Sequence, residues 1–185
     1  MFNMPLARKL PLIISVAAIL AAITAGYIGY YQGHASLVQA TQAKLTALLD
    51  NRKESLQNWF DAIEGDLHVQ ADNPFVFQAL QDFRYGWRTI GEDQTTRLQT
   101  LYITDNPHPT GAKDELNMAS DGSIYSSIHQ EYHPYFRSFL RDRGYYDIFL
   151  FDPDGNLVYT VFKELDYATN LNDGKWKNSD LGHAF

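Results

Sequence analysis

The sequence predicts an α+β protein with one transmembrane helix, then long antiparallel helices, and then the start of an antiparallel sheet. Three observations support this fold class. An uncharged apolar run extends from Leu10 to Tyr31, and apolar residues recur at helical spacing across much of 45–139. Two short segments rich in aromatic and β-branched residues follow at 145–151 and 157–163. Helices followed by neighbouring strands are typical of an α+β chain.

Composition excludes several classes of protein. The 185 residues are 45% hydrophobic and 14% aromatic, which is enough to build a core and unlike a disordered chain. The net charge of −7 argues against a nucleic-acid partner, because phosphate binding needs a basic patch. The sequence has no cysteine, which excludes a disulfide framework, a thiolate metal site and a cysteine nucleophile.

The apolar run is long enough to span a membrane. It has 22 residues and no charge, and as a helix it would cover roughly 33 Å. Arg8 and Lys9 precede it with no acidic residue before them, and such a positive end stays in the cytoplasm. We therefore expect residues 1–9 to be a cytoplasmic N-terminus, residues 10–32 a transmembrane helix, and the remainder to lie outside the cytoplasm.

A cleaved signal peptide is the alternative interpretation of this run. Signal peptides have an apolar region of about 7–15 residues that ends in an Ala-x-Ala-like site. The run here is longer, and Thr24-Ala25-Gly26 is its nearest approximation to such a site. The pattern favours an uncleaved anchor, both over a signal peptide and over a buried helix of a soluble protein.

The segment after the anchor predicts a long amphipathic helix. No proline occurs from His34 to Ala71, so the membrane helix can continue without a break. An apolar stripe needs a partner, either within the chain or from a second copy, and we expect a homodimer. The stripe consists of Leu45, Leu49, Leu56, Phe60, Ile63 and Leu67.

Further helices follow the first one. Asp72-Asn73-Pro74 combines a capping residue with proline at a first helical position, which predicts a second helix antiparallel to the first. Its apolar residues are Val76, Leu80, Phe83, Trp87 and Ile90. The pattern continues over 92–103, so residues 33–104 form a long-helix region. Another helix is expected around Tyr125–Phe139, restarting at Pro134 and ending at Gly144.

A β-hairpin is predicted next. YYDIFLF (145–151) and LVYTVFK (157–163) flank a five-residue loop that contains Gly155. A hairpin alone is marginally stable, and a sheet usually has three or more strands. We therefore expect residues 105–185 to be an incomplete portion of a domain. A fragment of a longer protein is favoured over strands supplied from elsewhere.

Three segments carry a resemblance to a known family. They are NPHPTGAKDEL (106–116), DGSIYSSIHQEYHPYFRSFLRDRGYYDIFLFDPDGNLVYTVFKELDYATNL (121–171) and the GKW…SDLG piece (174–182). Together they resemble the extracytoplasmic sensor region of an alphaproteobacterial methyl-accepting chemotaxis protein. The resemblance implies a PAS-like, Cache-type sensor in a bacterial inner membrane, with a cytoplasmic N-terminus and a periplasmic main part. It implies detection of a small ligand and transmission of a conformational signal, without enzymatic activity.

Two other outputs remain open. Similar sensor regions stand in front of histidine kinases and nucleotide cyclases, and a stand-alone membrane-tethered binding protein is a further alternative. Within these 185 residues the family's second membrane helix, HAMP segment, methylation helices and kinase-coupling tip are not found. We therefore expect this chain to sense without signalling to a kinase by itself.

The candidate ligand-binding residues lie on and around the hairpin. They combine aromatic walls with a few charges, as small-molecule pockets often do. In PAS-like sensors the ligand lies on the sheet face, which agrees with this position. A further candidate is Arg137, which together with Arg141 could clamp a carboxylate. The hairpin candidates are Tyr146, Asp147, Tyr159, Lys163, Tyr167 and Trp176.

Other motifs are better explained by structure than by chemistry. His129 and His133 are four residues apart, but Glu131 between them points away, so the metalloprotease geometry fails. The acidic loop from Asp152 lacks the glycine and glutamate positions of a calcium loop. No phosphate-binding or nucleophile motif occurs. We expect no metal, no cofactor and no catalytic residue.

Overall fold

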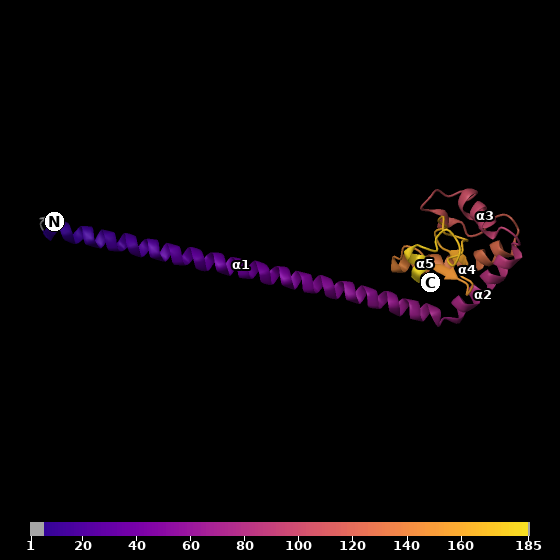
Figure 1. Ribbon diagram of the computed structural model, residues 1–185, viewed down its shortest axis with the longest axis horizontal. Coiled ribbons are helices and arrows are strands. Elements are labelled where there is room, and N and C mark those ends of the chain that lie inside the picture. Colours follow the sequence, from indigo (N-terminus) through magenta and orange to yellow (C-terminus); the bar gives the residue numbers. More distant parts are fainter. Residues whose placement is uncertain (1–5, 185) are drawn as a thin grey trace. The chain divides into compact units, whose positions relative to one another are not determined.

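The computed structural model describes residues 6–184 and divides the chain into two compact units. The N-terminal unit ends at Gly65 and the C-terminal unit begins at Asp66. The described chain is mostly helical and contains a small two-stranded antiparallel sheet (Figure 1). Residues 1–5 of the predicted cytoplasmic segment lie outside the described residues.

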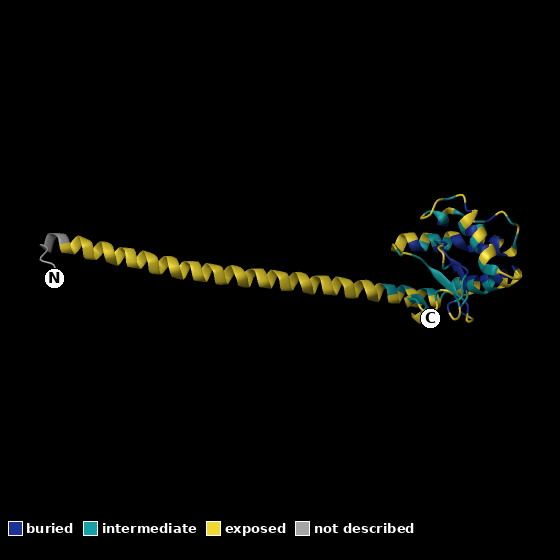
Figure 2. Ribbon diagram, turned by 45° about the horizontal axis from the view of Figure 1, so that its top comes forward, coloured by how far each residue is buried: buried dark blue, intermediate teal, exposed yellow. Residues whose placement is uncertain are grey.

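Helix α1 (Leu6–Ala71) is a single helix, as the pattern predicted. Every residue from Lys9 to Ala62 is exposed, including the apolar run (Figure 2). By length and composition α1 can cross a membrane, with a mean hydropathy of 2.2 in its most apolar part, and a signal sequence would share this property. The Thr24 hydroxyl donates to the Leu20 and Ala21 carbonyls, both at 3.0 Å, so this polar group is satisfied within the helix.

Helix α2 (Pro74–Thr89) begins as predicted. Asn73 is its N-cap and accepts a hydrogen bond from the Phe75 N–H at 2.9 Å, while Pro74 occupies the first turn. Within the C-terminal unit α2 packs against α4 and β2. Gly86 permits the close approach, because a Cβ there would lie only 3.0 Å from the Tyr125 Cα atom. The predicted antiparallel pairing of α2 with the first helix stays a prediction.

The segment predicted as helix over 92–103 changes its winding. It consists of α3 (Gln94–Gln99) followed by the π-helical turn η1 (Thr100–Thr104). Asp93, at φ 60°, caps α3 and accepts the Thr96 N–H at 3.4 Å. After the loop, a short 3-10 turn, η2 (Lys113–Glu115), leads toward α4. Short 3-10 turns are common as connectors between helices.

Helix α4 (Ile124–Arg143) runs without interruption through Pro134, so the expectation that the helix restarts there is wrong. The proline removes one N–H, but Pro134 and Gln130, whose carbonyl loses its partner, are both exposed, and water can replace the bond. Ser123 caps the start by accepting the Ser126 N–H at 3.1 Å. Gly144 ends the helix at φ 70°, as predicted.

The sheet is a hairpin of β1 (Phe149–Phe151) and β2 (Leu157–Thr160), with Leu150 opposite Tyr159. Both strands are shorter than predicted. The Asp147 carboxylate accepts the Val161 and Phe162 N–H groups at 2.9 and 3.3 Å, in place of further ladder bonds between the strands. The last helix, α5, spans Asp180–Ala184.

An aromatic core fills the C-terminal unit between α2, α4 and the hairpin. Its centre is Phe83, whose ring lies 4.6 Å from that of Tyr159 and 5.6 Å from that of Tyr125. Large buried rings exclude water from this region, which sets the environment of the polar groups described next. The fully buried large side chains include Tyr102, Tyr125, Tyr159, Tyr167, Phe83, Lys163, His129 and His133.

Candidate ligand-binding site

A cavity of about 670 Å³ lies beside this core in the C-terminal unit. Three segments form it: the end of η1 with the loop to η2, the stretch after β2, and the chain leading into α5. Its size is within the range of small-molecule sites. The lining residues that matter below are Lys113, Phe162, Lys163, Glu164, Asp166 and Trp176.

Lys163 stands between this cavity and the core. It is only 2% exposed, and its ammonium donates hydrogen bonds to the Thr160 and Val161 carbonyls. The ammonium also lies over three rings, those of Tyr159 at 4.4 Å, Tyr167 at 5.3 Å and Tyr102 at 5.8 Å. We call these three residues the tyrosine cage. Cation–π attraction partly replaces the lost hydration of the charge.

Burial lowers the pKa of Lys163 to about 7, and the negative charges of Asp147 and Asp114 only partly offset this. The Asp147 carboxylate is itself held by backbone donors, with the Ile148 N–H at 2.7 Å. Burial raises the pKa of Asp147. Desolvation disfavours both charges, whereas the lysine and the carboxylate each favour the charged form of the other.

Hydrogen bonds of tyrosine hydroxyl groups link the tyrosine cage to α4. Tyr125 donates to the Val158 carbonyl at 2.6 Å, so the Tyr167 hydroxyl, 2.7 Å away, donates to Tyr125. Tyr102 donates to the Ser126 hydroxyl at 3.0 Å. Burial raises the pKa of Tyr102 to about 12, and burial raises the pKa values of Tyr125 and Tyr167 as well. These hydroxyls therefore stay protonated and act as fixed hydrogen-bond donors.

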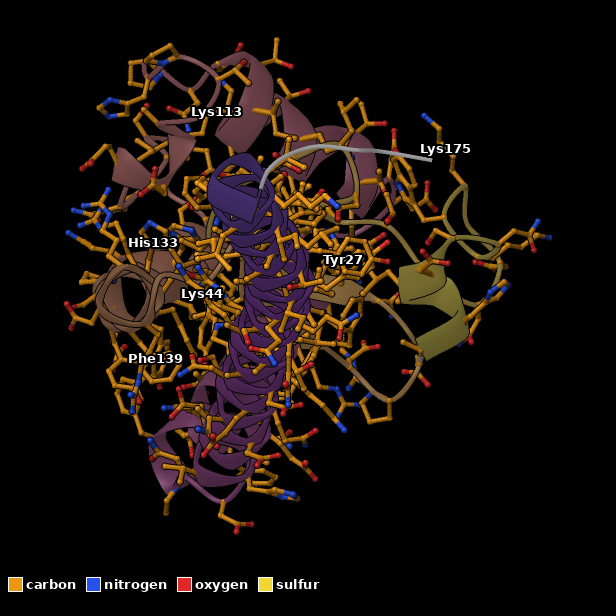
Figure 3. The ribbon with its side chains drawn as sticks, turned by 90° about the vertical axis from the view of Figure 1, so that its left-hand side faces the viewer. Tyr27, Lys44, Lys113, His133, Phe139 and Lys175 are labelled. Atoms are coloured by element: carbon orange, nitrogen blue, oxygen red, sulfur yellow. The ribbon has the colours of Figure 1, made fainter. Side chains whose placement is uncertain are left out.

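Two stacked histidines of α4 adjoin the cage, with ring centres 4.3 Å apart. His129 Nδ1 lies 2.6 Å from the Asn117 carbonyl and must carry the proton. His133 Nε2 donates to the Asp114 carbonyl at 2.6 Å (His133 is labelled in Figure 3), and the Tyr159 hydroxyl donates to His133 Nδ1. Burial lowers the pKa of His133 to about 2 and also lowers that of His129. Both rings are therefore neutral.

The nitrogens of the histidine pair differ in their hydrogen bonding. Both nitrogens of His133 are engaged by protein groups, and only His129 Nε2 is buried without a hydrogen-bond partner. Among residues 6–184, no group of three or more side chains suited to hold a metal ion occurs. The two rings thus serve packing and hydrogen bonding within the described structure.

The predicted arginines are engaged with acids of the chain. Arg137 donates to the Asp114 carbonyl at 2.7 Å and lies 3.7 Å from Glu115. Arg141 reaches the carboxylates of Asp114 and Glu115, both at 2.6 Å. A hydrogen bond from Arg141 lowers the pKa of Glu115. These contacts hold η2 against α4. Neither element belongs to the cavity-lining stretch that follows β2.

The structure brings some of the predicted residues together. Lys163 and Trp176 line the cavity, and Tyr159 and Tyr167 belong to the tyrosine cage around Lys163. Asp147 caps the end of the hairpin. Tyr146 is 74% exposed, and its hydroxyl donates to Glu164 at 2.8 Å. Arg137 does not line the cavity.

Sequence reasoning missed several residues of this region, namely Tyr102, Lys113, Phe162, Glu164 and Asp166. Tyr102 and Lys113 come from segments distant in sequence from the hairpin, and no local pattern points to them. Glu164 and Asp166 follow Lys163 directly as Lys-Glu-x-Asp, a charged turn beside aromatic residues. The Lys-Glu-x-Asp pattern was therefore a detectable signal for the site, but an exposed acidic turn without a binding role would show the same pattern.

Comparisons with protein-family models, with curated proteins and with solved structures found no match for this chain.

Proposed function

We propose that this chain is the membrane-anchored, extracytoplasmic sensor portion of a chemoreceptor. In this proposal the C-terminal unit is a PAS-like, Cache-type sensor that binds a small ligand without enzymatic activity. Helix α1 passes the resulting conformational signal across a bacterial inner membrane. The proposal rests on the chain's own residues and on the family resemblance of its sequence.

The main support for this proposal is the set of polar contacts that hold the end of α1 within the C-terminal unit. Tyr145 donates to the Asp66 carboxylate at 2.6 Å, and Arg143 pairs with the same residue at 3.0 Å. Tyr135 donates to Gln70 at 2.9 Å. The same helix carries the apolar run. A shift of α4 on ligand binding would therefore act on the helix that enters the membrane.

Charge and aromatic placement support the orientation. Arg8 and Lys9 precede the apolar run, and Tyr27, Tyr30 and Tyr31 lie at its other end. Positive residues stay on the cytoplasmic side, and tyrosines favour the membrane interface. This arrangement favours a C-terminal unit in the periplasm.

A ligand screen on the full chain in nanodiscs tests the sensing part. Small carboxylates, amino acids and amines are added, and the midpoint of thermal unfolding is measured. We expect at least one compound to raise the midpoint with a saturating dose dependence, since a ligand at 100 times its Kd stabilises by about 2.7 kcal/mol. A flat response to every class would contradict a small-molecule sensor.

A further inference from the structure

Two apolar surfaces from different parts of the chain border the cavity. Ile103 and Phe162 line it, are half-buried and pack against the aromatic core, and we call them the core wall. Leu165, Trp176 and Leu181 also line it but lie outside that core, and we call them the outer wall. Leu165 is 64% exposed. Apolar surface that the folded chain leaves uncovered gains free energy when a ligand removes it from water.

Helix α3 holds the outer wall in place at Leu165. The Gln99 side-chain amide donates to the Leu165 carbonyl at 3.1 Å, and the Thr95 hydroxyl donates to the Ala168 carbonyl. Lys163 and Ala168, on either side of Leu165 in the sequence, both have left-handed backbones, with φ 60° and 62°. Such a backbone is costly for a residue with a side chain and persists where neighbouring contacts hold it. This part of the wall is therefore formed before a ligand arrives, as in most small-molecule sites.

The chain already engages the charged groups of the cavity. Lys113 donates to two backbone carbonyls, at 2.6 and 3.2 Å (Lys113 is labelled in Figure 3). Lys163 donates to two others and lies against the tyrosine cage. Glu164 accepts from the Tyr146 hydroxyl at 2.8 Å, and backbone N–H groups hydrogen-bond the Asp166 carboxylate. Two lysines and two acids line the cavity, so the lining favours neither sign of ligand charge.

We propose that the cavity binds the apolar body of a small amphiphilic molecule, and an aromatic ring best, between the core wall and the outer wall. The cavity selects by this body and not by the charge of the polar end. A ring beside Trp176 and Phe162 gains both buried area and aromatic contact. Leu165 and Glu164 are exposed, so the cavity reaches the surface and the polar end of the ligand keeps its hydration. The inference rests on the proposed function, because it names the ligand class of the same sensor.

Paired probes test whether the ring or the charge decides binding. The full chain in nanodiscs of uncharged lipid is titrated by calorimetry with benzylammonium and methylammonium, and with benzoate and acetate. Rings also enter lipid, so the heat of each titration into nanodiscs without protein is subtracted. We expect each ring compound to bind at least about tenfold more tightly than its ring-free counterpart, because only the ring buries apolar area. The affinities of benzylammonium and benzoate should agree within about fivefold.

A variant assigns this binding to the cavity. Trp176→Ala removes the aromatic surface of the outer wall and should weaken benzylammonium and benzoate alike, by about tenfold. Trp59→Ala is the matched control, since Trp59 is an exposed tryptophan of the N-terminal unit. This control loses the same side chain and should bind both ring compounds like the parent chain.

Each result decides the inference. Ring-free probes that bind as tightly as their ring counterparts, or affinities of benzylammonium and benzoate that differ by tenfold or more, overturn it and leave the sensor proposal standing. Equal affinity of the parent chain and Trp176→Ala does the same. No binding of any probe overturns it too, and the broader screen described above then decides the sensor proposal separately. If circular dichroism shows that Trp176→Ala does not fold, Leu165→Ser takes its place. That variant changes an exposed residue and should weaken both ring compounds several-fold, and unchanged affinity would overturn the inference.

Discussion

Lys163 has two features that are costly for a lysine, burial and a left-handed backbone at φ 60°. The tyrosine cage and two carbonyls offset part of this cost. The balance makes the residue sensitive to pH near neutrality, because burial lowers its pKa to about 7. The group thus sits at the wall of the cavity with a charge that ordinary pH changes can alter.

The pH dependence of stability should reveal Lys163. The unfolded lysine titrates near 10.5 and the folded one near 7, so the unfolded chain binds more protons between these values. Stability should therefore rise with pH from about 7 to 9, by up to about 1 kcal/mol per pH unit. Lys163→Met should flatten this rise. Chemical unfolding of the full chain at pH 7, 8 and 9 measures the free energy of unfolding. The same pH dependence in the parent chain and in Lys163→Met would contradict its assignment to Lys163.

At the scale of elements, the cap of α4 connects stability to the site. Ser123 accepts the Ser126 N–H, and the Ser126 hydroxyl in turn accepts from Tyr102 of the tyrosine cage. Loss of the cap would loosen the first turn of α4, where Tyr125 also lies. The start of this helix is therefore a support for the cage as well as a helix end.

Ser123→Ala should lower the free energy of unfolding by about 1 kcal/mol, the usual cost of losing a capping hydroxyl. Ser127→Ala is the matched control, since its exposed hydroxyl only donates back to the Ser123 carbonyl of the same helix. Urea unfolding of the full chain compares the two variants. A control as destabilised as Ser123→Ala would show that the cap has no special role.

The exposed stripe of α1 has an internal period. Leu45, Leu56 and Leu67 are eleven residues apart, as are Val38, Leu49 and Phe60. An eleven-residue repeat gives about 3.67 residues per turn and keeps an apolar face in line along an almost untwisted or right-handed helix pair. In two copies anchored by their N-termini the helices would be parallel, which favours a homodimer through this face.

Cysteine cross-linking tests this pairing without background, because the chain has no cysteine of its own. In native membranes, Leu56→Cys should form a disulfide-linked dimer on mild oxidation. Asn58→Cys lies on the opposite face of α1 and should cross-link far less. Equal cross-linking at the two positions would argue against a dimer through the apolar stripe.

At the scale of the molecule, local sequence signals predicted the helices better than the site. Asn73-Pro74 and Gly144 marked helix ends correctly, because capping depends on neighbouring residues. Pro134 wrongly predicted a restart of the helix, because at its exposed position on α4 water can replace the lost hydrogen bond. The tyrosine cage was only partly predictable, because Tyr102 reaches Lys163 through tertiary packing. The strands ended early because the Asp147 side chain replaced backbone partners.

We expect an uncleaved anchor to hold the C-terminal unit outside the cytoplasm. Labelling of Asn178→Cys in intact bacterial cells with a membrane-impermeant maleimide tests it most directly, with Asn3→Cys as the cytoplasmic control. Asn178→Cys should be labelled before lysis and Asn3→Cys only after it, on an uncleaved chain in the membrane fraction. Labelling of Asn178→Cys only after lysis, or a shortened species in the soluble fraction, would contradict it.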